Sequence, residues 1–313
     1  MTKRKSGGIA SFAAALALAG CGGGGGAAFD PFPATDNVLP AEHPGAGAPM
    51  QTLADHAAAG GTWRVNLDGQ AGVSTAGDMT LYDALTYDAD LDVWGIYVNG
   101  EMIALSFVSG STNTYEATCS FLTNCQIWLV PDRVATGTTD YGAFGFVYVN
   151  GVWPSVAAEY FHYGLKTPVS AMPVGGTASY SGEWEANFAF LGDPQEYRGT
   201  ATVEATFAPD GGTVAVSVGM ASPFPFDLSG SATISGNSYA GTMTGTMVDI
   251  DGNSYTFAAA AGNTVSGAFY GPDQTGTSGE TAGVFHVATD PADANQMEIA
   301  GGFWAQQTSY AAP

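Results

Sequence analysis

The chain has 313 residues, with seven Lys and Arg against 29 Asp and Glu, a formal charge of −22 at pH 7. This excess of acid excludes a protein that binds nucleic acid through its phosphates, and it disfavours contact with anionic lipid headgroups. Such a surface attracts basic partners or cations, or it simply keeps an exported protein soluble. Apolar residues at 45% and aromatic residues at 12% are sufficient for a real core.

The N-terminus has the features of an export signal. Basic residues 3–5 precede an apolar, Ala-rich segment at residues 9–20, which is too short to span a bilayer as a mature helix. We predict a lipoprotein signal peptide at residues 1–20, because the segment ends in Leu18-Ala19-Gly20-Cys21, which looks like a bacterial lipoprotein cleavage box. Cys21 would carry the lipid. The alternative is an ordinary signal peptide followed by an unmodified cysteine.

Lipid at Cys21 predicts a protein that contacts the membrane by its lipid anchor only, since two or more acyl chains give stable attachment. Gly22 follows Cys21, where an Asp would signal retention in the inner membrane, and this favours the outer membrane. After the signal, four basic residues remain against 29 acidic ones, a formal charge of −25.

Residues 21–60 have the composition of a tether. Five glycines follow Cys21, and Pro, Ala and Gly recur through Gly61. Such a segment cannot bury enough apolar area to offset the entropy of ordering it. The composition of Gln51–Ala59 is compatible with a short helix, because this segment has fair helix formers.

Two cysteines remain beyond the anchor. Cys119 and Cys125 are separated by five residues, and export favours their oxidation. We predict a disulfide between them. The alternative, a pair of metal ligands, lacks a nearby His or third Cys.

Residues 61–174 are predicted to form a β-rich domain. Asn99-Gly100 separates the apolar runs Trp94–Val98 and Met102–Val108, and Asn150-Gly151 follows Phe144–Val149. Asn-Gly between such runs is a strong hairpin signal. The repeated YVNG at both turns fits an internal repeat or two hairpins with the same favoured turn.

Residues 175–313 show eight or nine alternating strands, each with one apolar and one polar face. Small and large residues alternate on the apolar face, as the inside of a small closed barrel requires. A transmembrane barrel would place its apolar face toward lipid. We favour a barrel filled with its own side chains, because the lipid anchor would be redundant, Gly and Ala are frequent on the apolar face, and no aromatic girdles mark the strand ends.

Two segments resemble transferrin-binding protein B and its relatives. Tyr160–Trp184 is similar to the junction between handle and barrel in that family, and Ser266–Phe285 is similar to a signature near the end of the barrel. The matching residues are Gly164, Thr167-Pro168, Met172-Pro173, Gly176, Tyr180, Gly182 and Trp184 in the first segment, and Gly267, Phe269-Tyr270-Gly271-Pro272, Glu280, Ala282-Gly283 and Phe285 in the second.

The resemblance implies an all-β fold, with a β-rich handle domain (61–174) followed by an eight-stranded antiparallel up-and-down β-barrel (175–313). It also implies an outer-membrane lipoprotein, often shown on the cell surface by a dedicated translocator. The chain has one handle and one barrel, whereas transferrin-binding protein B has two such lobes. Transferrin is therefore not carried over as the ligand.

The polar residues give no catalytic constellation. There is no Ser nucleophile elbow, no zinc spacing and no phosphate-binding Gly-rich turn, so we predict a non-enzyme without a cofactor or metal. His162, beside Tyr160 and Tyr163, fits aromatic packing better than haem ligation, and His286 is expected to face solvent. Residues 88–92 and 249–253 contain fragments of calcium loops, but both fit polar hairpin tips.

The predicted function is a surface lipoprotein that binds a carrier protein, or a haem or metal complex, for uptake together with a TonB-type receptor. The alternative is a structural or adhesive surface lipoprotein without nutrient cargo. Phe224, Phe226 and Trp153 lie beside predicted turns and are the candidate ligand contacts; the alternative for them is packing over the barrel mouth. The loop at Asp273–Gly279 is expected to be a polar tip whose only role would be contact with a partner.

Overall fold

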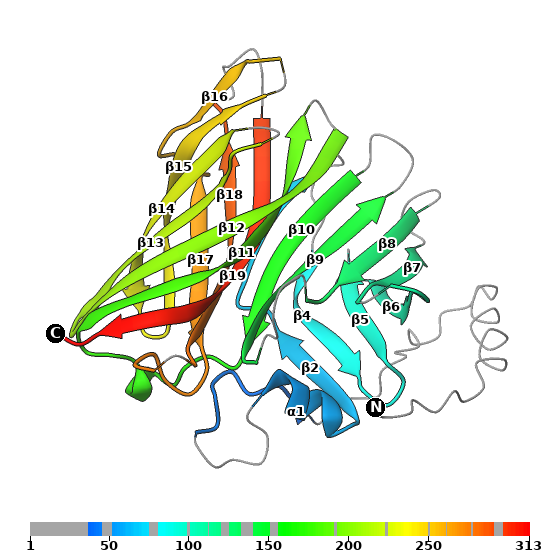
Figure 1. The fold of residues 1–313 in the computed structure, drawn as a ribbon. Coiled ribbons are helices and arrows are strands. Elements are labelled where there is room, and N and C mark those ends of the chain that lie inside the picture. The colour runs from blue at the N-terminus through cyan, green and yellow to red at the C-terminus, as the bar shows by residue number, and fades with distance from the viewer. Residues whose placement is uncertain are drawn as a thin grey trace, which may run out of the picture. The chain divides into compact units, whose positions relative to one another are not determined.

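A computed structural model describes residues 37–45, 52–74, 81–98, 101–111, 113–119, 125–132, 140–150, 156–190, 193–222, 225–249, 251–260, 262–276, 278–290 and 297–313. These residues form two β-sheets, one short helix, α1 (Leu53–Ala58), and a 3-10 turn, η2 (Val169–Ala171) (Figure 1). Within these ranges no helix has the length and hydropathy needed to cross a membrane. Both sheets belong to one compact unit, residues 32–313.

The first sheet, the handle, has ten strands in the order β1-β2-β4-β5-β6-β7-β8-β9-β10-β3. All neighbouring pairs are antiparallel except β1 and β2. Its strands are β1 (Asn37–Val38), β2 (Thr62–Asn66), β3 (Gly69–Ser74), β4 (Leu81–Asp88), β5 (Val93–Val98), β6 (Glu101–Phe107), β7 (Tyr115–Cys119), β8 (Cys125–Val130), β9 (Gly142–Asn150) and β10 (Val156–Gly164).

Both predicted hairpins of the handle are present, with different connections. Val98 pairs with Glu101, so β5 and β6 are joined by two residues, as an Asn-Gly turn requires. Asn150 pairs with Val156, so the connection between β9 and β10 spans residues 151–155. The expected two-residue turn at Asn150-Gly151 is therefore wrong, because Asn150 still belongs to the strand ladder.

The second sheet is a closed antiparallel barrel of eight strands, as predicted. Neighbours follow the order β14-β13-β12-β11-β19-β18-β17-β15, and pairing of β14 with β15 closes the sheet. β16 extends a hairpin from β15. The strands are β11 (Gly176–Phe190), β12 (Asp193–Ala208), β13 (Gly211–Met220), β14 (Phe226–Ser235), β15 (Ser238–Val248), β16 (Ser254–Phe257), β17 (Thr264–Tyr270), β18 (Glu280–Ala288) and β19 (Met297–Ala311).

The barrel is filled by the apolar face of its strands. In β14 every second residue is buried, from Phe226 to Ile234, while the residues between them are exposed. This follows from the two-residue repeat of a strand. The buried rings and aliphatic side chains form one cluster that includes Trp184, Phe188, Met243 and Phe303. The predicted orientation of the apolar face is therefore confirmed.

Strands β17 to β19 depart from this alternation, because both of their faces are buried. In β18 the six residues Glu280–Phe285 are all buried. Outward-facing residues of these strands pack against the handle in a separate apolar cluster, the junction cluster. Its buried members are Val130, Phe144, Phe146 and Tyr160 from the handle, and Ala268, Tyr270, Ala282, Val284, Ala300 and Trp304 from the barrel.

Part of the predicted tether is folded against the handle. Residues 37–38 pair with β2, Leu39 is 6% exposed, and α1 lies over the same sheet. The sequence is compatible with a helix here, and the start of α1 has a capping box between Thr52 and Asp55. The expectation of an unfolded tether is wrong for residues 37–45 and 52–60, because their few apolar side chains pack against the handle. The domain limits at residues 60 and 174 stay predictions.

Candidate functional site

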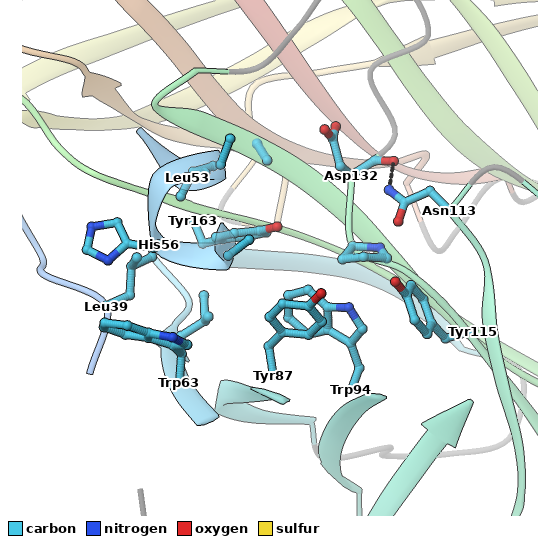
Figure 2. Close-up of a pocket in the computed structure, with 15 residues that line it drawn as sticks. Leu39, Leu53, His56, Trp63, Tyr87, Trp94, Asn113, Tyr115, Asp132 and Tyr163 are labelled. Atoms are coloured by element: carbon cyan, nitrogen blue, oxygen red, sulfur yellow. Dashed lines mark hydrogen bonds between the residues drawn. The ribbon is translucent and has the colours of Figure 1, made fainter. Parts of the chain in front are cut away.

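A pocket of about 310 Å³ lies in the handle between α1 and the sheet (Figure 2). We call it the handle pocket. Its floor residues are buried, and its rim carries half-buried or exposed residues such as Ala54 and Tyr87. It is lined by Leu39, Leu53, Ala54, His56, Ala57, Trp63, Val65, Tyr87, Trp94, Asn113, Tyr115, Pro131, Asp132, Ala143 and Tyr163.

Strand pairing places three aromatic rings in a row across the pocket. Trp63 on β2 is directly opposite Tyr87 on β4, which is directly opposite Trp94 on β5. Directly paired residues of neighbouring strands share a face of the sheet. The rings of Tyr87 and Trp94 are stacked, with centroids 4.7 Å apart, and Figure 2 shows them side by side.

Two tyrosine hydroxyls are fixed by one carboxylate. Tyr115 donates to Asp92 Oδ1 at 2.7 Å, and Tyr87 donates to the same oxygen at 3.2 Å. Asp92 adopts a positive φ of 53° in the turn after β4, an uncommon conformation for a residue with a side chain. Burial and then Asp92 raise the pKa of Tyr87 to about 12 and that of Tyr115 further. Both hydroxyls therefore stay neutral donors.

His56 contributes the one imidazole of the wall. Its side chain is 4% exposed, and its ring meets Trp63 edge to face at 5.1 Å. Neither ring nitrogen has a hydrogen-bond partner among the described residues. Burial lowers the pKa of His56 below 6.5, although Asp55 acts in the opposite direction. The neutral ring thus offers one donor and one acceptor.

The far side of the pocket is fixed by the chain after β8. The amide of Asn113 donates to the backbone oxygen of Asp132 at 2.9 Å, as Figure 2 shows. Tyr163 on β10 is buried, and burial followed by the charge of Asp132 raises the pKa of its hydroxyl. The lining residues include no Lys or Arg. The arrangement can hold a ligand by ring faces and by single hydrogen bonds.

The candidate contacts predicted from the sequence do not meet in this pocket. Cys21, Trp153 and Phe224 lie outside the described residues, so their roles stay predictions. Phe226 is 3% exposed and packs against Trp184 and Phe188 inside the barrel. Its proposed contact role is contradicted, because strand alternation turns its ring inward.

Cys119 and Cys125 end β7 and β8 and are direct Cα partners. Their side chains lie outside the described set, and no disulfide is seen among the residues that the structure describes. Direct cross-strand partners lie within the Cα separation that a disulfide needs. The disulfide therefore stays a prediction.

The other histidines and acidic fragments take structural roles. His162 is 1% exposed, and its Nδ1 lies 2.7 Å from the Tyr270 hydroxyl, which donates to Asp68 at 2.9 Å. This favours packing at the junction over haem ligation. Asp88 and Asp249 accept backbone N–H groups of their own hairpin tips. No group of three metal-ligating side chains occurs in the described ranges.

The loop after β17 is not a free polar tip. Gln274 is fully buried, donates to Thr167 at 2.7 Å and accepts from Tyr180 at 2.7 Å. Glu280 at the end of the loop accepts three backbone N–H groups of the handle, from Asp140, Tyr141 and Gly142, at 2.8–3.1 Å. The loop therefore holds the two sheets together, and the expectation of partner contact alone is wrong.

Sequence reasoning missed the aromatic wall of the handle pocket. Its rings come from strands spread over a hundred residues, and each ring alone resembles an ordinary core residue. The one available signal was the alternation of Trp and Tyr on handle strands. The pairing of β2 with β4, and of β4 with β5, brings Trp63, Tyr87 and Trp94 together.

The fold and the pocket define a class of protein with two β-sheets. One sheet is a barrel packed with its own side chains, and the other is a handle sheet that carries a pocket. No family model and no curated protein matches the chain. The chain is similar to solved structures of transferrin-binding protein B, which is the family whose motifs the sequence resembles.

One similar structure is a variant of transferrin-binding protein B from Haemophilus parasuis Hp5, at 17% identity and a TM-score of 0.48, covering 77% of this chain and 45% of that one. Another is the isotype 1 protein from serogroup B Neisseria meningitidis, at 16% identity and a TM-score of 0.41, covering 80% and 43%. A surface lipoprotein is similar at 19% identity and a TM-score of 0.32, covering 56% and 80%. The chain spans less than half the length of both transferrin-binding proteins.

Proposed function

We propose that this protein is a non-enzymatic binding protein whose handle pocket holds part of its ligand. The observation that carries the proposal is the pocket itself, about 310 Å³ in volume and walled by aromatic rings. The buried side chain of His56 lines it, and its two nitrogens have no hydrogen-bond partner among the residues that the structure describes. Apolar walls with a few polar groups are typical of ligand sites. The barrel interior is filled by its own side chains.

The chemistry of the pocket supports binding in place of catalysis. Its tyrosine hydroxyls have raised pKa values and stay protonated, and two of them are fixed by Asp92. A general base needs a pKa near the operating pH and a proton to abstract within reach. The groups of this pocket are arranged to orient a ligand by hydrogen bonds and ring faces.

The proposal also covers where the protein is located and which ligand it binds. The cleavage box before Cys21 supports a lipid anchor, Gly22 after it supports the outer membrane, and the family resemblance supports display at the cell surface. The family resemblance supports a carrier protein or a haem or metal complex as ligand, and a TonB-type receptor as the next partner. The similar structures named for transferrin binding have TM-scores below 0.5, so the proposal rests on the pocket and the sequence motifs.

Protease treatment of intact cells tests the location. We expect the protein to be degraded without permeabilising the outer membrane, and a Cys21→Ala chain to lose its membrane association. Protection until the outer membrane is opened would place the protein on the periplasmic face and reject surface display.

Ligand binding is tested on the full chain in detergent. Haemin is titrated while the absorption spectrum is recorded, and haem-loaded and haem-free carrier proteins are tested by surface plasmon resonance. We expect Tyr87→Leu to weaken any complex, while Trp128→Leu, outside the pocket, leaves it unchanged. A complex that is insensitive to Tyr87→Leu would reject the handle pocket as the binding site.

A further inference from the structure

The walls of the handle pocket are rich in electron-rich aromatic rings. Trp63, Tyr87 and Trp94 form the row across β2, β4 and β5, and Tyr115 meets Trp94 edge to face at 6.3 Å. The face of an aromatic ring carries negative electrostatic potential and attracts cations. Indole rings are the best of these faces, and this pocket has two of them.

The carboxylate behind the tyrosines strengthens this potential. Asp92 accepts hydrogen bonds from the hydroxyls of Tyr87 and Tyr115 at 3.2 and 2.7 Å. A phenol that donates to a carboxylate becomes more electron-rich, because the bond draws its proton away from the oxygen. The negative charge also lies close to the rings, whereas no Lys or Arg lines the pocket.

The imidazole of His56 adds an uncharged ring to the wall of the pocket, because burial lowers its pKa. The side chain is 4% exposed, and both of its nitrogens lack a partner among the described residues. Both nitrogens are closed off from the pocket, so His56 contributes ring surface to the wall and no hydrogen bond to a ligand.

Size and net charge indicate where the cation comes from. A pocket of about 310 Å³ is at the lower end of the range of about 300–1,000 Å³ for ligand sites, so it fits one side chain better than a macrocycle. The chain after the signal has a formal charge of −25, and this field steers basic partners toward the protein.

We propose that the handle pocket is an aromatic cage for a lysine or arginine side chain on a basic protein partner. The inference rests on the proposed binding function and names the group that the pocket recognises. The ring row holds the charged end by cation–π contact, and the carboxylate of Asp92 behind the two tyrosines adds to the attraction.

Two small probes on the full chain test the cage. Nα-acetyl-lysine methylamide carries the cation, and Nα-acetyl-norleucine methylamide has the same aliphatic chain without it. At matched ionic strength, tryptophan fluorescence should show the lysine probe binding about tenfold or more tightly than the norleucine probe. A preference for the cationic probe by this margin supports the proposal.

Variants then assign the effect to the rings. We expect Tyr87→Leu to weaken the lysine probe by ~5- to 30-fold and Tyr87→Phe, which keeps the ring, by no more than about threefold. Trp128→Leu is the matched control: Trp128 packs on Tyr148 at 5.4 Å and does not line the pocket. Circular dichroism confirms that each variant is folded.

Three outcomes would overturn the cage. Equal binding of both probes would make the pocket an apolar site and leave the proposed binding function intact. Binding of neither probe, with a partner complex still sensitive to Tyr87→Leu, would show that the pocket recognises another group. A Soret shift with haemin that His56→Ala abolishes would assign the pocket to haem, again without rejecting the binding function.

Discussion

The imidazole of His286 lies between two acceptors, and this arrangement favours its charged form. Nε2 is 2.7 Å from Glu298 Oε1, and Nδ1 is 2.8 Å from the backbone oxygen of Gly262. Both nitrogens must carry protons to satisfy both acceptors. The sequence predicted a solvent-facing histidine from its place between Phe285 and Val287. The ring does point away from the barrel interior, but a carboxylate on the neighbouring strand covers part of it.

This pair predicts a pH-dependent contribution to stability. Burial lowers the pKa of His286, but the hydrogen bonds to Glu298 and Gly262 outweigh it, so the pKa is raised. A raised pKa in the folded state means that the stabilisation is complete below the unfolded value of about 6.5 and is lost as pH rises through the folded pKa.

A double-mutant cycle of His286→Gln and Glu298→Gln measures this coupling by urea unfolding at about pH 5.5 and about pH 8.5. The cycle removes the general effect of the protein's net charge, because that effect is common to all four proteins. We expect favourable coupling at the lower pH and little at the higher. Coupling that grows with pH would contradict the assignment of a charged histidine.

At the scale of elements, the barrel strands were the easiest part of the fold to predict. Their apolar residues face one interior, so the two-residue repeat appears directly in the sequence, as in β14. The same argument fails for β17 to β19, where Ala268, Ala282 and Ala300 face the handle and are buried on the outer side. The local sequence pattern is the same for an outward-facing alanine that the handle covers and for one that is exposed to solvent.

Close contact between strands leaves no free space for a side chain at Gly241 in the barrel. Gly241 on β15 is paired with Ala232 on β14, and a Cβ at this position would collide with the backbone oxygen of Ser231. Backbone cannot move away as a flexible side chain can, so overpacking should cost about 1–3 kcal/mol.

We therefore expect Gly241→Ala to lower the free energy of unfolding by about 1–3 kcal/mol in urea titrations. The control is Gly262→Ala, because no atom of the residues that the structure describes lies within 4 Å of a Cβ built on Gly262. It should change stability by no more than about 0.5 kcal/mol. Equal effects of the two variants would show that strand spacing does not set the requirement for glycine at position 241.

The β7–β8 hairpin carries a prediction about oxidation. Cys119 and Cys125 are direct Cα partners, and a disulfide closing so short a loop should stabilise by roughly 2–3 kcal/mol in the chain-entropy estimate. Peptide mapping without reductant should recover the two cysteines in one linked fragment. Reductant should then lower the unfolding midpoint of the native chain, but not that of a Cys119→Ser, Cys125→Ser variant. Alkylation of both thiols in the native, unreduced protein would exclude the disulfide.

For the whole molecule, the junction explains what the sequence motifs mean. Glu280 and Tyr270, two residues of the predicted barrel signature, both contact the handle: Glu280 binds three of its backbone N–H groups, and the Tyr270 hydroxyl bonds with His162 and Asp68. The motif was predicted to build the barrel. In the structure it also joins the barrel to the handle, and this role required partners more than a hundred residues away that sequence alone does not identify.

The junction predicts that the handle and the barrel unfold together. Glu280 is 1% exposed, and its two oxygens both accept from the handle backbone. In Glu280→Gln an amide group replaces one of these oxygens and faces an N–H donor, which should cost about 1–3 kcal/mol. Because the junction cluster includes buried residues of both sheets, this loss should lower the stability of both.

Fluorine NMR of 5-fluorotryptophan protein can follow the two sheets separately in urea, since Trp63, Trp94 and Trp128 lie in the handle and Trp184 and Trp304 in the barrel. Of the six tryptophan signals, we expect these five to share one midpoint in the native chain and to shift together to lower urea in Glu280→Gln. Glu204→Gln is the control, because its carboxylate accepts from the hydroxyl of Ser179 in an exposed hydrogen bond, so its effect should stay within about 0.5 kcal/mol. Handle signals that change at lower urea than barrel signals in the native chain would contradict a single cooperative unit. Glu280 would then connect two independently stable sheets, and a pocket ligand would stabilise the handle alone.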